Sequence, residues 1–133
     1  MTEKEIDSFE KVQIQLEGMY EEISILSKKS QTEALSLFKL KFINHILNDS
    51  NSVLGVRYKP FNDFEIFDEN NIPTNSDAVM ILAQYLNCFE KMRVDNITSI
   101  KTFDGNKSVY NWYWVQKNGI VGNIKTTEPK KIK

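Results

Sequence analysis

The sequence predicts an α+β fold, in which an up-down-up bundle of three helices is followed by a small C-terminal antiparallel β-meander or hairpin. Apolar residues recur with helical spacing up to about Asn96, and beyond it β-branched and aromatic residues alternate with polar ones. We expect one domain over residues 1–133, with a helical part (1–96), a β part (97–128) and a frayed basic tail (129–133).

The first predicted helix covers about residues 3–28 and carries one apolar seam. The members of the seam alternate between spacings of three and four residues, the pattern of a helix that packs on another helix: Phe9, Val12, Leu16, Met19, Ile23 and Leu26. We favour a partner helix within the same chain. The alternative is a self-association seam that would join two copies of the chain in a homodimer.

Local capping signals place the other two helices. Ser30-Gln31-Thr32-Glu33 has the form of a capping box and predicts a second helix over about 31–47, with an end between Leu47 and Gly55. The polar run 74–77 predicts the start of a third helix, over about 77–95. Its apolar arc is the widest of the three, so we expect Leu86 and Phe89 to be fully buried.

The long connection between the second and third helices, residues 56–75, is rich in aromatic and acidic residues. A connection of this length and composition usually packs on the body of the protein or takes part in binding. Its aromatic residues are therefore candidate binding residues: Tyr58, Phe61, Phe64 and Phe67.

Three strands are predicted in the β part, at about 98–103, 108–116 and 120–126, and Asn118-Gly119 is a strong hairpin signal between the last two. In the middle strand, one face carries the further binding candidates Tyr110, Trp112 and Trp114. We expect Trp112 or Trp114 to be exposed beside the aromatic connection, forming one binding surface. The alternative is a small sheet that is covered on both faces.

Arg93, near the end of the third predicted helix, is a further binding candidate with two interpretations. We favour an arginine whose head is free or bonded to the last helical carbonyls. The alternative is a partly buried arginine paired with a carboxylate, for which the segment 63–69 is one candidate source.

Composition and motifs exclude several function classes. The chain has 17 basic and 18 acidic residues, so the basic excess of a dedicated nucleic-acid binder is absent. A single cysteine, Cys88, rules out an intramolecular disulfide framework and a cysteine-based zinc finger. The common phosphate, dinucleotide, zinc-protease and hydrolase motifs are missing, and nothing places the single histidine, His45, beside Cys88. We expect no cofactor and no metal.

The function that these observations favour is a non-catalytic protein-interaction module, such as an adaptor, an inhibitor or an immunity-type protein. Frequent Asn, Ile and Lys suggest a bacterial or phage origin, and we expect a cytoplasmic protein that binds another protein and no membrane. The alternative is a small nucleic-acid-associated accessory protein that uses the aromatic strand and the basic tail. A third alternative, an enzyme with an unrecognised site, stays open.

Overall fold

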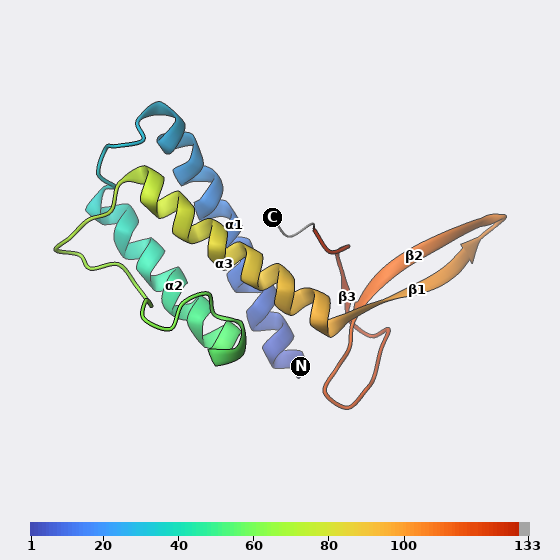
Figure 1. The fold of residues 1–133 in the computed structure, drawn as a ribbon. Helices are drawn as coiled ribbons and strands as arrows, with labels where there is room; N and C mark the ends of the chain where they lie inside the picture. The colour runs from blue at the N-terminus through green and yellow to red at the C-terminus, as the bar shows by residue number, and fades with distance from the viewer. Residues whose placement is uncertain (131–133) are drawn as a thin grey trace.

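Three helices pack against one another, and a small sheet follows them, in the computed structural model of the chain, which describes residues 1–130 (Figure 1). The predicted α+β class, with three helices followed by a small antiparallel sheet, is confirmed, but the up-down-up arrangement is wrong. The second and third helices run in the same direction, because the Leu35 N–H donates to the Pro73 carbonyl at their starts and the Tyr58 hydroxyl donates to Asp95 at their ends (Figure 1). Residues 131–133 of the predicted tail lie outside the described residues. The elements in chain order are α1 (Glu3–Lys29), α2 (Leu37–Tyr58), α3 (Asn75–Asn96), β1 (Ile97–Asp104), β2 (Lys107–Trp114) and β3 (Lys125–Thr126).

Helix α1 begins with a capping box and buries its predicted seam within the chain. The Thr2 side chain accepts from the Glu5 N–H, and the Glu5 carboxylate accepts from the Thr2 N–H, both at 3.2 Å. Four seam residues are buried in the core, and Met19 and Leu26 are partly buried against it. Because α2 and α3 of the same chain already contact α1, a dimer through this seam would require the core to open. The oligomeric state itself stays a prediction.

Helix α2 begins six residues later than predicted. Ser30 is the C-cap of α1, and Ser36 is the N-cap of α2, accepting from the Lys39 N–H at 3.2 Å. The intervening backbone pairs with the segment that precedes α3: the Leu35 N–H donates to the Pro73 carbonyl at 3.0 Å. These long-range bonds satisfy backbone groups that a helix start at Ser30 would have used, so tertiary contacts override the local capping signal.

Gly55 interrupts the end of α2. Its φ of 66° and ψ of −176° lie in a region that is almost restricted to glycine, and the chain then continues helically as far as Tyr58. The positive φ agrees with the helix-ending role predicted for Gly55. The kink directs the chain into the aromatic connection.

We expect opposite effects when Gly55 and Gly18 are each replaced by alanine. Gly55→Ala imposes a side chain on a left-handed backbone and should lower the free energy of unfolding by about 1–3 kcal/mol. Gly18→Ala lies within α1, where an added methyl group would meet no atom within 4 Å, and should raise it by up to about 1 kcal/mol. Urea unfolding followed by circular dichroism measures both, and a destabilisation by Gly18→Ala would contradict this account of α1.

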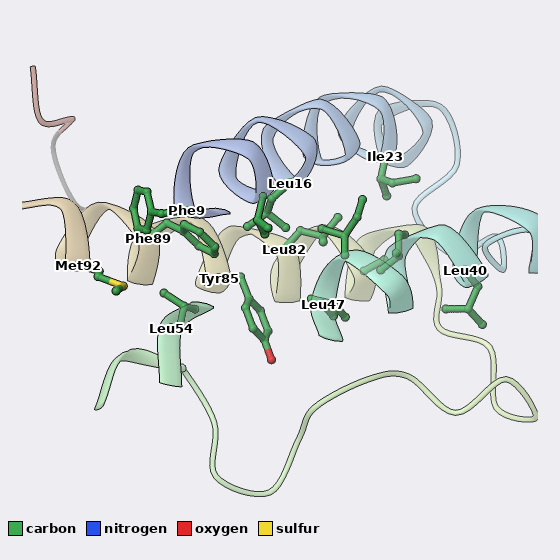
Figure 2. Close-up of a cluster of buried hydrophobic side chains, with 14 of the residues drawn as sticks. Phe9, Leu16, Ile23, Leu40, Leu47, Leu54, Leu82, Tyr85, Phe89 and Met92 are labelled. Carbon is green, nitrogen blue, oxygen red and sulfur yellow. The ribbon is translucent and has the colours of Figure 1, made fainter. Parts of the chain in front are cut away.

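Helix α3 lies at the centre of the core (Figure 2). Leu82, Tyr85 and Phe89 are completely buried, and the Phe9 and Phe89 rings lie 4.9 Å apart. The prediction for Phe89 is thus confirmed, but the one for Leu86 is wrong. Leu86 is only partly buried, because it lines a shallow groove between α1 and α3.

The sheet is antiparallel, in the order β1-β2-β3, and its long β1–β2 hairpin extends away from the helices (Figure 1). Ile97 pairs with Trp114 at the base, and Asp104 pairs with Lys107 near the tip. The third strand is much shorter than predicted, because residues 115–124 form a loop. Asn118-Gly119 makes a local turn in this loop, where the Gly119 N–H donates to the Gln116 carbonyl, and the predicted tight hairpin there is wrong.

Candidate functional site

A buried arginine joins α1, α3 and the sheet. Arg93 makes a two-pronged ion pair with Glu10, in which Nη1 and Nη2 each lie 3.1 Å from one carboxylate oxygen. The same guanidinium donates to the side chains of Gln13 and Thr126. Its Nε lies 3.7 Å from the carboxylate of Glu90, which in turn accepts from Gln13 at 2.7 Å. Arg93 is therefore the centre of a polar network in an otherwise apolar interface.

Trp114 closes this network from the side of the sheet. Its ring is completely buried and packs edge-on against Phe9 at 5.0 Å, while its Nε1–H donates to Glu10 at 2.9 Å. The Arg93 guanidinium lies 5.2 Å from both ring centroids, which adds a cation–π contribution. The base of the hairpin is thus fixed to the helices by apolar packing and by charge-assisted hydrogen bonds.

The C-terminal segment is fixed to the same network. The Thr126 hydroxyl donates to Glu10 at 3.0 Å, and the Lys130 N–H donates to Glu90 at 3.1 Å. Because Thr126 also pairs with Trp112 in the sheet, these bonds determine where β3 forms. They account for the ten-residue loop that replaces the predicted hairpin turn.

Opposing effects act on the pKa of Glu10. Burial of the carboxyl raises its pKa, but hydrogen bonds from Arg93 and the charge of Arg93 lower it, and hydrogen bonds from Trp114 and Thr126 lower it further. The net result is a pKa below the ordinary value of 4.5. Glu10 is therefore ionised in the folded protein near neutral pH.

We expect this ion pair to make stability depend on pH in the acidic range. The stabilisation from Glu10 is fully present above its unfolded pKa of 4.5 and is lost as the pH falls through the lower folded value. In denaturant unfolding at several pH values, the free energy of unfolding should fall less steeply with decreasing pH in Glu10→Gln than in the wild type. Glu21→Gln, which removes an exposed carboxylate from α1, controls for the change in net charge. Equal pH slopes in wild type and Glu10→Gln would contradict the assignment.

The favoured interpretation of Arg93 is wrong, and the alternative is right that Arg93 is buried and paired with a carboxylate, but not about the source of that carboxylate. Its head is neither free nor paired with the segment 63–69, but is buried against Glu10 of α1, 83 residues earlier in the chain. Glu10 directly follows the seam residue Phe9, so it stands at the edge of the buried face. That position is the signal by which Glu10 could have been recognised as a partner for a buried cation.

An exposed aromatic face lies on the projecting part of the hairpin. The register places alternate residues of β1 and β2 on one side of the sheet. We call four of them, which lie beyond its base, the aromatic face: Lys101, Phe103, Tyr110 and Trp112. Phe103 is 72% exposed and Tyr110 is 59% exposed, whereas Trp112 is partly buried. The Lys101 ammonium lies 5.5 Å from the Phe103 ring centroid and 5.9 Å from that of Tyr110.

An open groove runs along the same side of the sheet, between the hairpin and the C-terminal segment. It has a volume of about 630 Å³ and is lined by Ser99, Tyr110, Asn111, Trp112, Lys125, Thr126 and Glu128. Aromatic surface, one lysine and one carboxylate thus meet in a concave site. Such a site is suited to holding an extended ligand by stacking and hydrogen bonds.

The aromatic connection does not lie beside the hairpin, as the sequence led us to expect. It returns along the outer side of the helices, from the end of α2 to the start of α3, away from the projecting hairpin (Figure 1). Phe61, Phe64 and Phe67 are partly buried and pack edge-on in sequence, and Phe61 also contacts the Tyr85 ring. Asn44 clamps this connection by bonding both backbone groups of Phe67 at 2.9 Å. The connection therefore packs on the body of the protein, which is one of the two roles expected from its length and composition.

Tyr58 and Trp114, the remaining two predicted site residues, have structural partners. Tyr58 is partly buried and donates from its hydroxyl to Asp95 at 2.8 Å, joining the end of α2 to the end of α3. Burial and the hydrogen bond to Asp95 raise the pKa of Tyr58. Trp114 belongs to the core. Of the predicted site residues, only Tyr110 and Trp112 therefore face the groove.

His45 and Cys88 show no catalytic arrangement. His45 is exposed on α2, with its Nε2 3.5 Å from Asp49, and Cys88 packs against the core from α3. Burial raises the pKa of the Cys88 thiol, which disfavours the reactive thiolate. Among residues 1–130, no group of three or more His, Cys, Asp or Glu side chains is placed to hold a metal ion.

Charge is separated between the two parts of the chain, and the near-zero total conceals this. Residues 1–96 contain 10 basic and 16 acidic residues, whereas residues 97–133 contain seven lysines against Asp104 and Glu128. The hairpin and the C-terminal segment are thus basic and the helices are acidic. Comparing the two parts, instead of totalling the chain, is the signal that identifies the part from residue 97 onward as electrostatically distinct from the helical part.

Comparison of the chain with known protein families, curated proteins and solved structures finds no relative. The sequence matches no model of a known protein family, and neither a curated protein nor a solved structure matches the chain. In the part of the chain that the structure describes, no helix is both long enough and apolar enough to cross a membrane.

Proposed function

We propose that this protein is a non-catalytic binding module that contacts another protein through the aromatic face of its hairpin. The observation that carries the proposal is a pair of exposed aromatic side chains, Phe103 and Tyr110, on an element that projects from the helices. A cytoplasmic location and a bacterial or phage origin belong to the same proposal. They rest on the single cysteine and on the frequent Asn, Ile and Lys of the sequence.

The way in which the base of the hairpin is held against the helices supports this role. Binding surfaces work best when their anchor residues are held by rigid elements. Trp114 and Arg93 fix the base of the hairpin, while all ten residues from 101 to 110 stay exposed. Tyrosine and tryptophan supply large contact areas at a small loss of side-chain entropy and dominate the energetics of many interfaces.

The charge of the hairpin narrows the class of partner. Lys101, Lys107 and Lys125 all belong to the sheet, and the described segment 97–130 contains only two acidic residues. Complementary charge steers association and selects against partners of like charge. We therefore propose a partner protein with an acidic surface or segment.

Two matched phenylalanines test this proposal. The immobilised protein first captures candidate partners from its host, and each is purified and titrated calorimetrically against wild type, Phe103→Ala and Phe38→Ala. Phe38 lies on α2 and is 73% exposed, so it matches Phe103 in residue type and exposure. We expect Phe103→Ala to weaken binding by about tenfold or more and Phe38→Ala to leave it unchanged. The reverse pattern would transfer the binding site to α2 and overturn the proposal.

Single-stranded nucleic acid is the second candidate partner, favoured by the position of Lys101 over two aromatic rings and by the basic hairpin. Aromatic platforms flanked by lysines stack successive bases with little sequence preference. Fluorescence anisotropy with labelled oligo-dT and oligo-U at low salt tests this function. Binding that Tyr110→Ala abolishes and that weakens steeply with salt would favour it over the protein partner. No binding at low salt would exclude it.

A further inference from the structure

The outer edge of β1 is unpaired within the described residues. Strand β2 lies between β1 and β3, so β1 has a neighbour on one side only. The Trp114 N–H donates toward β3, at Ile124, so by alternation residues 98, 100 and 102 bond β2. The backbone groups of Ile97, Ser99, Lys101 and Phe103 consequently point outward.

Such an edge is unusual in a monomer. A two-stranded hairpin alone is at best marginally stable in water, and long uncovered edges readily pair with other strands. Beyond the base of this hairpin, all ten residues from 101 to 110 are exposed, with Phe103, Val109 and Tyr110 among them. The edge of β1 extends over eight residues.

We propose that β1 pairs antiparallel with β1 of a second copy of this chain, with the two Ile100 residues opposite each other on the twofold axis. The two hairpins then form one continuous sheet. This inference goes beyond the proposed function, because it uses the edge of the hairpin and leaves the aromatic face free for another partner.

Backbone alternation and charge together select this register. Residues 97, 99, 101 and 103 all point outward, so twofold pairing through hydrogen bonds must place odd residues opposite odd residues. Centring the axis on Lys101 would put the two lysines directly opposite each other, which is unfavourable. Centring it on Ser99 or Thr102 leaves only five residues of each strand overlapping. The axis through Ile100 overlaps residues 97–103 without opposing like charges.

The side chains brought together in this register are complementary. Thr98 lies opposite Thr102 of the second copy, and Phe103 lies opposite its Ile97, both favourable cross-strand combinations. Lys101 lies opposite a serine, Ser99.

Cysteine cross-linking tests the register directly. Ile100→Cys in a Cys88→Ser background places the two cysteines opposite each other, with their Cα atoms about 4.5 Å apart. This separation is within the range that a disulfide can bridge. Mild oxidation with oxidised glutathione should convert most of this variant to a covalent dimer on non-reducing gels. Thr102→Cys in the same background should form no covalent dimer on the same gels, because its opposite residue is Thr98. Cross-linking of Thr102→Cys without Ile100→Cys would overturn the register.

Removing one outward N–H tests the pairing without any cross-link. Ser99→Pro deletes an edge donor but no bond to β2, and Ser99→Ala retains the N–H at the same position. Sedimentation velocity from micromolar to millimolar concentration should show a monomer–dimer equilibrium for wild type and Ser99→Ala, with at least tenfold weaker association for Ser99→Pro. A monomeric wild type throughout this range would overturn the dimer. Partner binding by the aromatic face would be unaffected by that result, so failure of this inference is distinguishable from failure of the proposed function.

Discussion

Replacing Arg93 with methionine is expected to lower the free energy of unfolding by about 3–5 kcal/mol. The change leaves Glu10 without its cation in a partly buried site and removes the donors that hold Gln13 and Thr126. Methionine retains much of the apolar stem that packs between the Phe9 and Trp114 rings, so the loss reports mainly on charge and hydrogen bonds. Urea unfolding at pH 7 measures the change.

A double-mutant cycle separates the ion pair from the packing. In Arg93→Met with Glu10→Leu both charges are gone, and the double variant should be more stable than Arg93→Met alone. If the free energy of unfolding of the double variant instead falls by the sum of the two single decreases, the two groups are not coupled and the network does not anchor the hairpin. Near-ultraviolet circular dichroism of Trp114 follows the same variants.

Truncating Phe89 to alanine should also destabilise the protein by about 3–5 kcal/mol. Its ring is completely buried and contacts Phe9, which in turn contacts Trp114, so the cavity would open where α1, α3 and the sheet meet. A loss of this size is a large part of the roughly 5–15 kcal/mol that stabilises a typical domain.

The matched control for Phe89→Ala is Phe38→Ala, which removes the same atoms from an exposed position. It should change stability by no more than about 0.5 kcal/mol. Thermal unfolding of both variants is sufficient for the comparison. Similar melting temperatures for the two would mean that Phe89 is not at the centre of the core.

The helices were predictable because their apolar spacing is a local property of the sequence. The seam of α1 and the wide apolar arc of α3 both lie in the core, as their periodicity indicated. The start of α2 was not predictable, since the backbone of residues 31–36 pairs with a segment about 40 residues later. A capping box describes only local bonding and carries no information about such a partner.

The candidate site was predictable only in part. Alternation in β2 identified Tyr110 and Trp112 as one face, but it did not show that Trp114, on the same face, enters the core. The partner of Arg93 lies on another helix, and the pairing of two single residues leaves no local pattern. Lys101 and Phe103 were not predicted as site residues because β1 lacks the dense aromatic run of β2, although the register pairs Lys101 with Tyr110 and places Phe103 on the same face.

Hydrogen–deuterium exchange, with and without a purified partner, tests most directly the claim that binding takes place on the projecting hairpin. The account predicts that the partner slows exchange in peptides covering residues 97–114 and leaves those from α2 unchanged. Slower exchange confined to α2, around the exposed Phe38 and Phe42, with an unaltered hairpin would contradict it.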